Sequence, residues 1–323
     1  YSLIFGVDFD PSAEIITVVT AVLDFYVPQL KKDLQNNFDN GLVRELNKAY
    51  NLLRKKPSDR DLLNEFKLSV ETYNSTIDSF VMDGTFSRNL DSQHHLPLYV
   101  VECILQQIYT RVVSPKVDML KRYENGSDNV YGELLPPLVS KILGEAGLTS
   151  ESIFVDLGSG VGNVVLQSAL EFGCESWGCE MMENAFLLAD RQKKEFVVRC
   201  QLWAIQTGRV NLERGNFLEN QQIHKVLRKA DVVLVNNQAF TPDLNQKLKD
   251  LFLDLKDGCR IISLKSFVTH GHQISTRNLW DPANLLEVTE GEYHSRSVSW
   301  TDAGGSYFIS KKNEKRLMKF YGQ

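Results

Sequence analysis

Apolar residues recur at three- and four-residue intervals through the first quarter of the chain. The spacing is clearest in two runs of positions: Ile15, Val18, Val19, Val22, Leu23 and Tyr26, and then Leu62, Leu63, Phe66 and Val70. One face of an α-helix repeats in this way, so the pattern predicts helices between residues 11 and 81. Pro57-Ser58-Asp59 interrupts the region and is expected to cap the helix that follows. Further helices are predicted over 98–113 and 136–144, with irregular chain over 80–97.

After residue 150 the pattern changes to short apolar runs that alternate with helical periodicity. Strands are predicted over 153–157, 176–180, 210–214, 232–235 and 260–264, with helices over 164–172, 182–207, 223–228 and 244–255. Strands that alternate with helices predict an α/β fold with a doubly wound parallel sheet. Two more strand-like runs, 285–299 and 306–310, are separated only by a short gap at 302–305. A parallel pair needs a longer crossover, so this pair is predicted to form an antiparallel hairpin.

Composition places the chain among ordinary globular proteins and makes some partners less suitable. The 323 residues are 43% hydrophobic and 24% charged, which argues against a disordered or fibrous chain. Residues 1–150 hold 15 Lys/Arg against 20 Asp/Glu, and residues 151–323 hold 21 against 21. Neither half has the surplus of positive charge with which a protein grips a nucleic-acid backbone unaided. The net negative charge lies entirely in the first half.

The cysteines and the apolar stretches exclude further classes of protein. The five cysteines form no CxxC pair, so the sequence predicts neither a zinc site nor a disulfide framework. The longest apolar stretch, 15–23, is far shorter than the ~20 residues that cross a bilayer, and no membrane partner is expected. Because the chain begins at Tyr1, we expect it to be a fragment of a longer protein.

A glycine-rich loop follows the first predicted strand and opens the first helix after it. The run is Phe154, Val155, Asp156, Leu157, Gly158, Ser159, Gly160, Val161, Gly162 and Asn163. Glycines at such a turn let a ligand approach the backbone, and the helix presents its N-terminus to that ligand. The loop predicts a nucleotide-type cofactor; the alternative is a purely structural turn.

The spacing within the loop favours S-adenosylmethionine (SAM) over a dinucleotide. The dinucleotide fingerprint is GxGxxG, whereas Asn163 stands at the position of its third glycine. Asp156 would repel a pyrophosphate but attract the amino group of SAM. Glu180, at the end of the next strand, is placed to accept both ribose hydroxyls, unless it is only a solvated charge. Asn216 and Phe217 follow the third strand and could hold adenine, although an Asn turn beside a core Phe explains them equally well.

Polar residues at the end of the fourth strand are candidates for the transfer site. The run is Val235, Asn236, Asn237, Gln238, Ala239, Phe240, Thr241 and Pro242. Ligands of such sheets lie beyond the carboxyl ends of the strands, so these amides and the aromatic should face the transferred group. Nucleic-acid amino-methyltransferases often carry Asp/Asn-Pro-Pro-Tyr/Phe here, and the two prolines are absent.

Four motifs together resemble a known family. They are Tyr131-Gly132-Glu133-Leu134, the glycine loop with Val155-Asp156 before it, Val235-Asn236-Asn237-Gln238-Ala239-Phe240, and Val298-Ser299-Trp300-Thr301 through Ser306-Tyr307. In this order they resemble the disruptor of telomeric silencing family, the non-SET histone H3 lysine methyltransferases. The resemblance covers roughly residues 90 to 308. Within the family, the chain closely resembles the budding-yeast member.

The resemblance implies a fold and site residues. The fold is the class I SAM-dependent methyltransferase fold, Rossmann-like, with a seven-stranded, mostly parallel sheet that ends in an antiparallel hairpin, plus an N-terminal mainly helical region. The family's cofactor loop falls on Tyr131, Gly132, Glu133 and Leu134, and the family's transfer-site amide is Asn236. The lysine-channel aromatics fall on Phe240, Trp300 and Tyr307, and Tyr131 is counted with the catalytic group. No metal is expected.

The resemblance also implies partners and a place of action. The substrate is a lysine on the nucleosome core surface of histone H3, and the expected role is chromatin regulation and telomeric silencing in the nucleus, as a monomer. Weak DNA contact is expected through Lys311–Lys319. The alternatives are a nucleic-acid amino-methyltransferase and a SAM-binding chromatin adaptor without catalysis. Along the chain we expect a helical region (1–125), a cofactor-loop linker and helix (126–150), the methyltransferase domain (151–312) and a basic tail (313–323).

Overall fold

The computed structural model describes residues 9–28, 41–121 and 132–321. The chain forms two compact units, Tyr1–Cys103 and Ile104–Gln323. The division therefore falls inside one helix, α6 (Leu98–Val112), some twenty residues before the boundary expected at residue 125. The four-part division of the chain stays a prediction.

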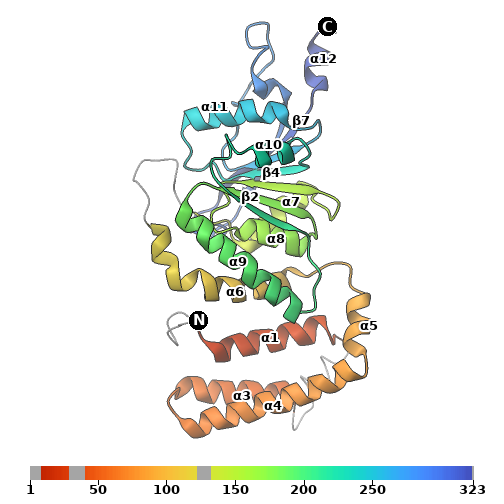
Figure 1. The fold of residues 1–323 in the computed structure, drawn as a ribbon, viewed down its shortest axis with the longest axis vertical. Coiled ribbons are helices and arrows are strands. Elements are labelled where there is room, and N and C mark those ends of the chain that lie inside the picture. Colours follow the sequence, from red (N-terminus) through yellow and green to blue (C-terminus); the bar gives the residue numbers. More distant parts are fainter. Residues whose placement is uncertain (1–8, 29–40, 122–131, 322–323) are drawn as a thin grey trace. The chain divides into compact units, whose positions relative to one another are not determined.

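The first unit is helical, as its periodicity predicts. Its helices are α1 (Pro11–Phe25), α3 (Leu42–Lys55), α4 (Arg60–Met82) and α5 (Thr85–Asp91) (Figure 1). The Asp59 carboxylate accepts from the backbone N–H groups of Asp61 and Leu62, which confirms the predicted cap at the start of α4. The prediction of irregular chain over 80–97 is wrong in part, because α4 continues to Met82 and α5 follows it after one turn.

The second unit is built on one seven-stranded sheet, and its order confirms the predicted fold class. The order is β3-β2-β1-β4-β5-β7-β6. The strands are β1 (Ile153–Leu157), β2 (Glu175–Glu180), β3 (Val210–Arg214), β4 (Val232–Val235), β5 (Arg260–Ser263), β6 (Leu286–Tyr293) and β7 (Gly305–Lys312). The first five pair in parallel, and β7 runs antiparallel to both of its neighbours. All seven strands were expected from the sequence. The bounds of β1, β3 and β4 are those predicted, whereas β2, β5, β6 and β7 begin or end at other residues.

Helices cover both faces of the sheet, which is why its central strands are mostly apolar. On one face, α7 (Pro136–Glu145) and α8 (Asn163–Glu171) pack on Phe154 and Leu234. On the other face, α10 (Gln221–Leu227) and α11 (Pro242–Leu251) pack on Val155 and Val235. The remaining elements are α9 (Glu183–Leu202), the 3-10 turns η1 (Ser114–Lys121), η2 (Phe252–Asp254) and η3 (Pro282–Leu285), and α12 (Lys315–Tyr321). Alternate residues of one strand thus enter two cores, as in parallel sheets generally.

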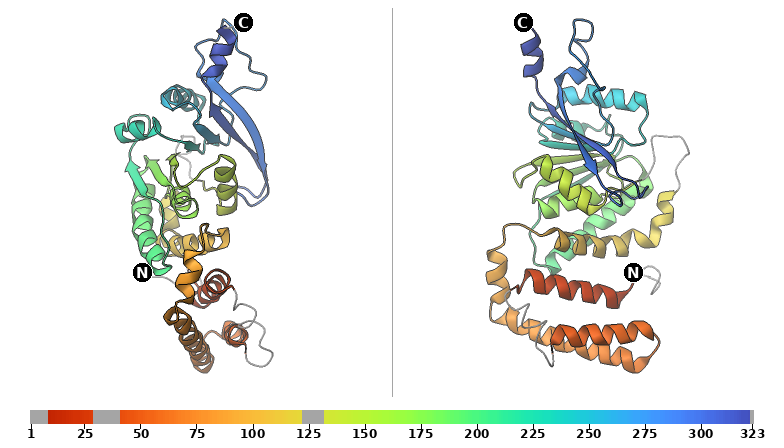
Figure 2. Two further views of the ribbon diagram at one scale, coloured as in Figure 1. Left: turned by 90° about the vertical axis from the view of Figure 1, so that its right-hand side faces the viewer. Right: turned by 180° about the vertical axis from the view of Figure 1, so that it is seen from behind.

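The terminal hairpin is present, but its first strand is shorter than predicted. β6 ends at Tyr293 rather than at residue 299, so the two strands are joined by an eleven-residue connection (the long blue pair in Figure 2). Residues 297–299 pair elsewhere: the Leu135 N–H donates to the Ser297 carbonyl at 3.0 Å and the Ser299 N–H donates to the Glu133 carbonyl at 2.9 Å. The last part of the predicted strand, residues 297–299, therefore belongs to a second, separate pairing.

The start of the segment predicted to contact DNA, Lys311–Lys319, lies partly in the core. Lys312 is 3% exposed, and its Nζ donates to the carbonyl oxygens of Leu253 and Leu255 at 2.7 and 2.6 Å. The Glu314 carboxylate lies 3.3 Å from the same ammonium. Lys312 therefore holds the chain after η2 and is not available to DNA, whereas Lys311 is exposed. The predicted DNA contact through Lys311–Lys319 therefore cannot include Lys312.

No helix among the described residues is long and apolar enough to cross a membrane.

Candidate functional site

The glycine loop turns at the carboxyl ends of β1 and β2. Gly158, Gly160 and Gly162 have φ of 86°, 54° and 86°, a left-handed backbone that side chains with a Cβ rarely adopt. The N–H groups of Gly158 and Ser159 donate to the Cys179 carbonyl at 2.9 and 3.0 Å, which ties the loop to β2. The glycines are thus required by the turn itself, and the turn forms the floor of the candidate site.

Two buried carboxyl groups lie beside this loop. Asp156 is 4% exposed and Glu180 is 8% exposed. Burial, and then the charge of Glu180, raise the pKa of Asp156 to about 8. Burial also raises the pKa of Glu180, against the effect of nearby backbone N–H groups. Neither carboxyl forms an ion pair with a basic residue among the described parts of the chain. A ligand that carries positive charge would complete this pair.

Glu180 also fixes the loop. Its two carboxylate oxygens accept from the N–H of Gly160 at 2.8 Å and from the N–H of Met182 at 2.6 Å. The group predicted to bind ribose hydroxyls is therefore held at the mouth of the glycine loop by backbone donors. Its role toward a ribose stays a prediction.

The residues after β3 show the contacts of a turn. The Asn216 amide oxygen accepts from the Leu218 N–H at 3.0 Å, and its nitrogen donates to Glu219 at 3.2 Å. Phe217 is 9% exposed and packs in the core with α10. These are the contacts that the alternative of an Asn turn beside a core Phe implies. The adenine role of both residues stays a prediction.

Three motifs far apart in the sequence meet at Gly132. The Asn236 amide donates to the Gly132 carbonyl at 3.2 Å. A Cβ on Gly132 would lie 2.5 Å from Cε3 of Trp300, so the indole ring lies directly on this glycine. The hydrogen bonds that join Glu133 and Leu135 to residues 297–299 hold the two segments together. Only a glycine leaves room for the indole ring here.

The other described residues of the predicted cofactor loop pack in the core or form hydrogen bonds. Leu134 is buried and packs with α7. The Glu133 N–H donates to the Ser299 hydroxyl at 2.8 Å, and its carboxylate accepts from the Tyr109 hydroxyl at 3.1 Å. Tyr131, predicted for both cofactor binding and catalysis, lies outside the described residues.

Phe240 is held near the glycine loop by a pair of amide side chains. A Cβ on Gly158 would lie 3.8 Å from Cζ of Phe240. Asn237, 1% exposed, accepts from the N–H groups of Leu264 and Lys265 and donates to Asn245 and to the Lys265 carbonyl, all at 2.8–3.0 Å. Asn245 in turn donates to the carbonyls of Phe240 and Thr241 at 3.3 and 3.0 Å. The two amides connect the ends of β4 and β5 to α11.

Asn245 was not predicted by sequence reasoning, and Asn237 was noted only as part of a motif. Asn237 stands next to Asn236 in an unusual run of amides, which was the available sign of a role. Asn245 lies on a helix with ordinary polar periodicity, and nothing in the sequence distinguishes it from its neighbours.

Tyr307 lies among buried residues rather than at an open surface. It is 2% exposed and packs with Leu134, Val298 and α7. Its hydroxyl donates to the Glu145 carboxylate, and burial together with this bond raises its pKa. Trp300, by contrast, is 36% exposed. Of the three predicted channel aromatics, Trp300 lies against Gly132 and Phe240 lies near Gly158, while the Tyr307 hydroxyl is turned to α7.

The other residues of the predicted glycine-loop run are buried in the core or lie at the start of α8. Phe154, Val155, Leu157 and Val161 are buried. The Asn163 side chain accepts from Gln192, which also donates to the Val161 carbonyl at 2.7 Å. No group of three or more His, Cys, Asp or Glu side chains that could hold a metal occurs in the described part of the chain.

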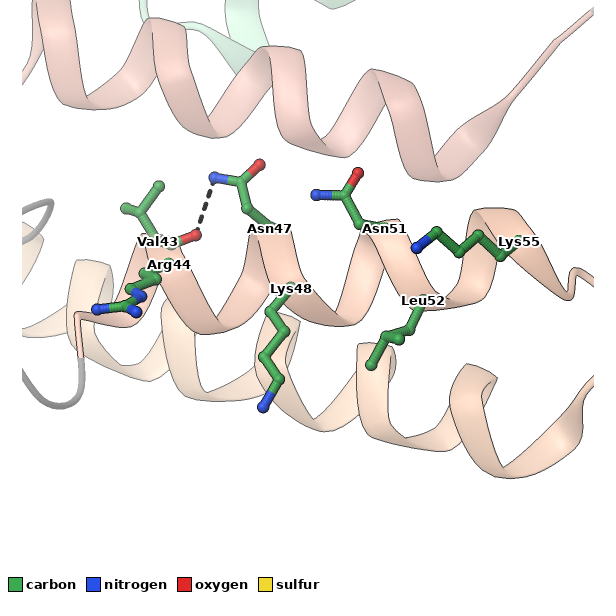
Figure 3. Close-up of a pocket in the computed structure, with 7 residues that line it drawn as sticks. All are labelled: Val43, Arg44, Asn47, Lys48, Asn51, Leu52 and Lys55. Carbon is green, nitrogen blue, oxygen red and sulfur yellow. Dashed lines mark hydrogen bonds between the residues drawn. The ribbon is translucent and has the colours of Figure 1, made fainter.

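The chain also has a hollow in its first unit, of about 660 Å³, lined by residues of α3 (Figure 3). It lies in a different compact unit from the glycine loop.

Comparison with known proteins gives a consistent family. A sequence model described as "Histone methylation protein DOT1" matches residues 109–312. A protein of Emericella nidulans named "Histone-lysine N-methyltransferase, H3 lysine-79 specific" is 53% identical over 97% of this chain and 61% of its own length. Proteins of the same name from Yarrowia lipolytica and Eremothecium gossypii are 40% and 36% identical, over 97% and 94% of this chain and 62% and 51% of their own lengths. The chain thus spans between about half and three-fifths of the length of these curated relatives.

Solved structures of methyltransferases are more distant. An RNA methyltransferase of Salinibacter ruber in complex with S-adenosyl-L-homocysteine has a TM-score of 0.39 at 20% identity, over 56% of this chain and 94% of its own. An O-methyltransferase of Bacillus cereus in complex with SAH has a TM-score of 0.41 at 10% identity, over 65% of this chain and 90% of its own.

Proposed function

Because the chain belongs to the DOT1 histone methylation family, we propose that it transfers methyl groups from SAM to a lysine on the nucleosome core surface of histone H3. The observation that carries the proposal is the meeting of Asn236 and Trp300 at Gly132. This meeting brings together residues predicted for the cofactor loop, for the transfer-site amide and for the lysine channel.

The buried carboxyl pair supports SAM as the cofactor. When bound, SAM supplies a methyl group on a sulfonium centre, and it also carries an ammonium group. Asp156 and Glu180 lack a basic partner among the described residues, and in their ionised form they would complement these cations. A bound cation would in turn favour that ionised form. The positive φ of the loop glycines lets the ligand approach the backbone closely. The residues present therefore fit the cofactor.

The aromatic residues suit a lysine substrate. A lysine has a pKa of ~10.4, so its neutral, nucleophilic form at pH 7 costs about 4.6 kcal/mol. Trp300 and Phe240 would remove the lysine side chain from water and so disfavour its ammonium form. Asn236, anchored on the Gly132 carbonyl, would position the amine against the methyl group. No dedicated general base is assigned.

The proposal is tested by incubating the chain with labelled SAM and either nucleosomes or naked DNA. We expect label on histone H3 and none on DNA. Label on DNA alone would favour a nucleic-acid amino-methyltransferase. SAM binding without label on either substrate would favour a non-catalytic chromatin adaptor.

The remaining parts of the proposal follow from the substrate. We propose that the protein acts in the nucleus, in chromatin regulation and telomeric silencing, and that the chain is a monomer. Exposed Lys311 and its neighbours toward Lys319 would add a weak DNA contact, without the buried Lys312.

Asn245→Ala is expected to lower kcat about tenfold and to leave the Kd for SAM within twofold. The change removes the two hydrogen bonds that hold the Phe240 and Thr241 carbonyls, so the loop after β4 loses its alignment while the glycine loop keeps its own. Steady-state kinetics on nucleosomes and calorimetric SAM titration measure both quantities. Gln246→Ala, on the next position of α11, is the control and should change neither. A parallel loss of SAM affinity in Asn245→Ala would mean that this amide holds the cofactor site instead.

A further inference from the structure

Three of the five charged residues of helix α3 lie along one stripe of its solvent side. Val43, Leu46, Ala49 and Leu53 face the core of the first unit. At 100° per residue, the opposite side of the helix carries Arg44, Lys48, Asn51 and Lys55, all of them exposed. No acidic residue lies within this group. The solvent side of α3 is therefore a basic and amide surface, which we call the α3 face.

The α3 face stands out against the charge of its surroundings. Residues 41–60 hold six Lys/Arg against two Asp/Glu, whereas residues 1–103 hold ten against fifteen. The acidic balance of the first half, which argued against nucleic acid, thus hides a local reversal of sign. Electrostatic attraction to a partner depends on such local concentrations of charge more than on the total.

The α3 face contains two lysines, Lys48 and Lys55. Lys48 and Lys55 make no ion pair or side-chain hydrogen bond within the described residues. Their positions are seven apart, so their Cα atoms lie about 10 Å apart along the helix axis. The face borders the hollow of about 660 Å³, and Figure 3 shows that the side chains drawn there come from α3 alone.

We propose that the α3 face binds the phosphate backbone of duplex DNA. Lysine and amide side chains are the groups that bind phosphate and sugar without reading sequence. A protein partner would need apolar or aromatic anchors at its centre, and the face offers only the half-buried Leu52. The inference rests on the proposed function to the extent that a nucleosome brings DNA to the enzyme.

The test is the salt dependence of binding to a 30-base-pair duplex of mixed sequence, measured by fluorescence anisotropy with the full 323-residue chain. Removing two phosphate contacts should reduce the slope of log K against log salt by about two. We therefore expect Lys48→Glu/Lys55→Glu to lose at least about tenfold in affinity at low salt. Lys48→Arg/Lys55→Arg should keep it, since the charge is retained.

The control is Lys225→Glu/Lys229→Glu, which makes the same change of net charge at two exposed lysines in and just after α10. It should leave the slope unchanged, which separates the α3 face from a general charge effect. Circular dichroism of each variant checks that the helices remain.

Activity measurements distinguish this proposal from the proposed function. On nucleosomes, Lys48→Glu/Lys55→Glu should raise KM at least fivefold, with SAM affinity unchanged. If the wild-type chain binds DNA through these lysines yet methylates no histone, the α3 face stands and the proposed function fails. An unchanged DNA affinity in the variant overturns the proposal. A loss of affinity only toward DNA-free histone octamers also overturns it, because that result would mean that the α3 face binds an acidic protein surface.

Discussion

Gly160→Arg is expected to abolish SAM binding and, with it, methylation of nucleosomes. Gly160 has a φ of 54° in the glycine loop, and its N–H donates to Glu180. An arginine here strains the backbone by about 1–2 kcal/mol, and its guanidinium would occupy the space beside Asp156 and Glu180 that we assign to the cationic cofactor. We expect the Kd for SAM to rise at least about 100-fold.

A matched control is Gly271→Arg. Gly271 also has a left-handed backbone, with φ of 74°, and nothing lies within 4 Å of the Cβ it would acquire. It carries a similar backbone strain without reaching the glycine loop, so SAM affinity and activity should survive. Calorimetric titration with SAM measures the affinity of both variants. If nucleosome methylation survives Gly160→Arg, the assignment of the glycine loop is wrong.

Asp156→Asn is expected to stabilise the protein in the absence of ligand at alkaline pH, and to weaken SAM binding at least about tenfold. Burial raises the pKa of Asp156 from 3.8 to about 8, so the folded protein holds a proton that the unfolded chain has released. Stability therefore falls as the pH rises between about 4 and about 8, and levels off above that. Asparagine removes this pH-dependent penalty, but also the charge that would attract the cofactor.

Thermal unfolding between pH 5 and pH 9 checks the sign. The Tm of Asp156→Asn should exceed that of the wild type by several degrees more at pH 8 than at pH 5. Asp243→Asn is the control, because Asp243 is an exposed carboxyl with a side chain 77% accessible. An equal Tm difference at the two pH values would contradict the burial of an ionisable Asp156.

Local patterns predicted most of the architecture. The alternation of short apolar runs with helices predicted the parallel sheet, and the run that ends in Asp59 predicted a helix cap, because both depend on residues close in sequence. The end of β6 was wrong for a related reason. The predicted strand ran on to residue 299, but residues 297–299 pair with the segment after Gly132, and a pattern does not identify the partner.

The features of the candidate site can likewise be separated into those that the sequence determines and those that depend on the tertiary structure. By itself the sequence determined the fold class, the glycine loop and the presence of carboxylates and amides at strand ends, since each is a matter of local spacing. Only the tertiary structure decided that Asn236 and Trp300 meet at Gly132, that Asp156 and Glu180 are buried together, that Lys312 lies in the core and that three charged residues of α3 lie along one stripe of its solvent side. The physical reason is that burial and the electrostatic coupling of charges depend on what packs around a residue. Those neighbours come from segments distant in the sequence, up to 168 positions apart for Gly132 and Trp300.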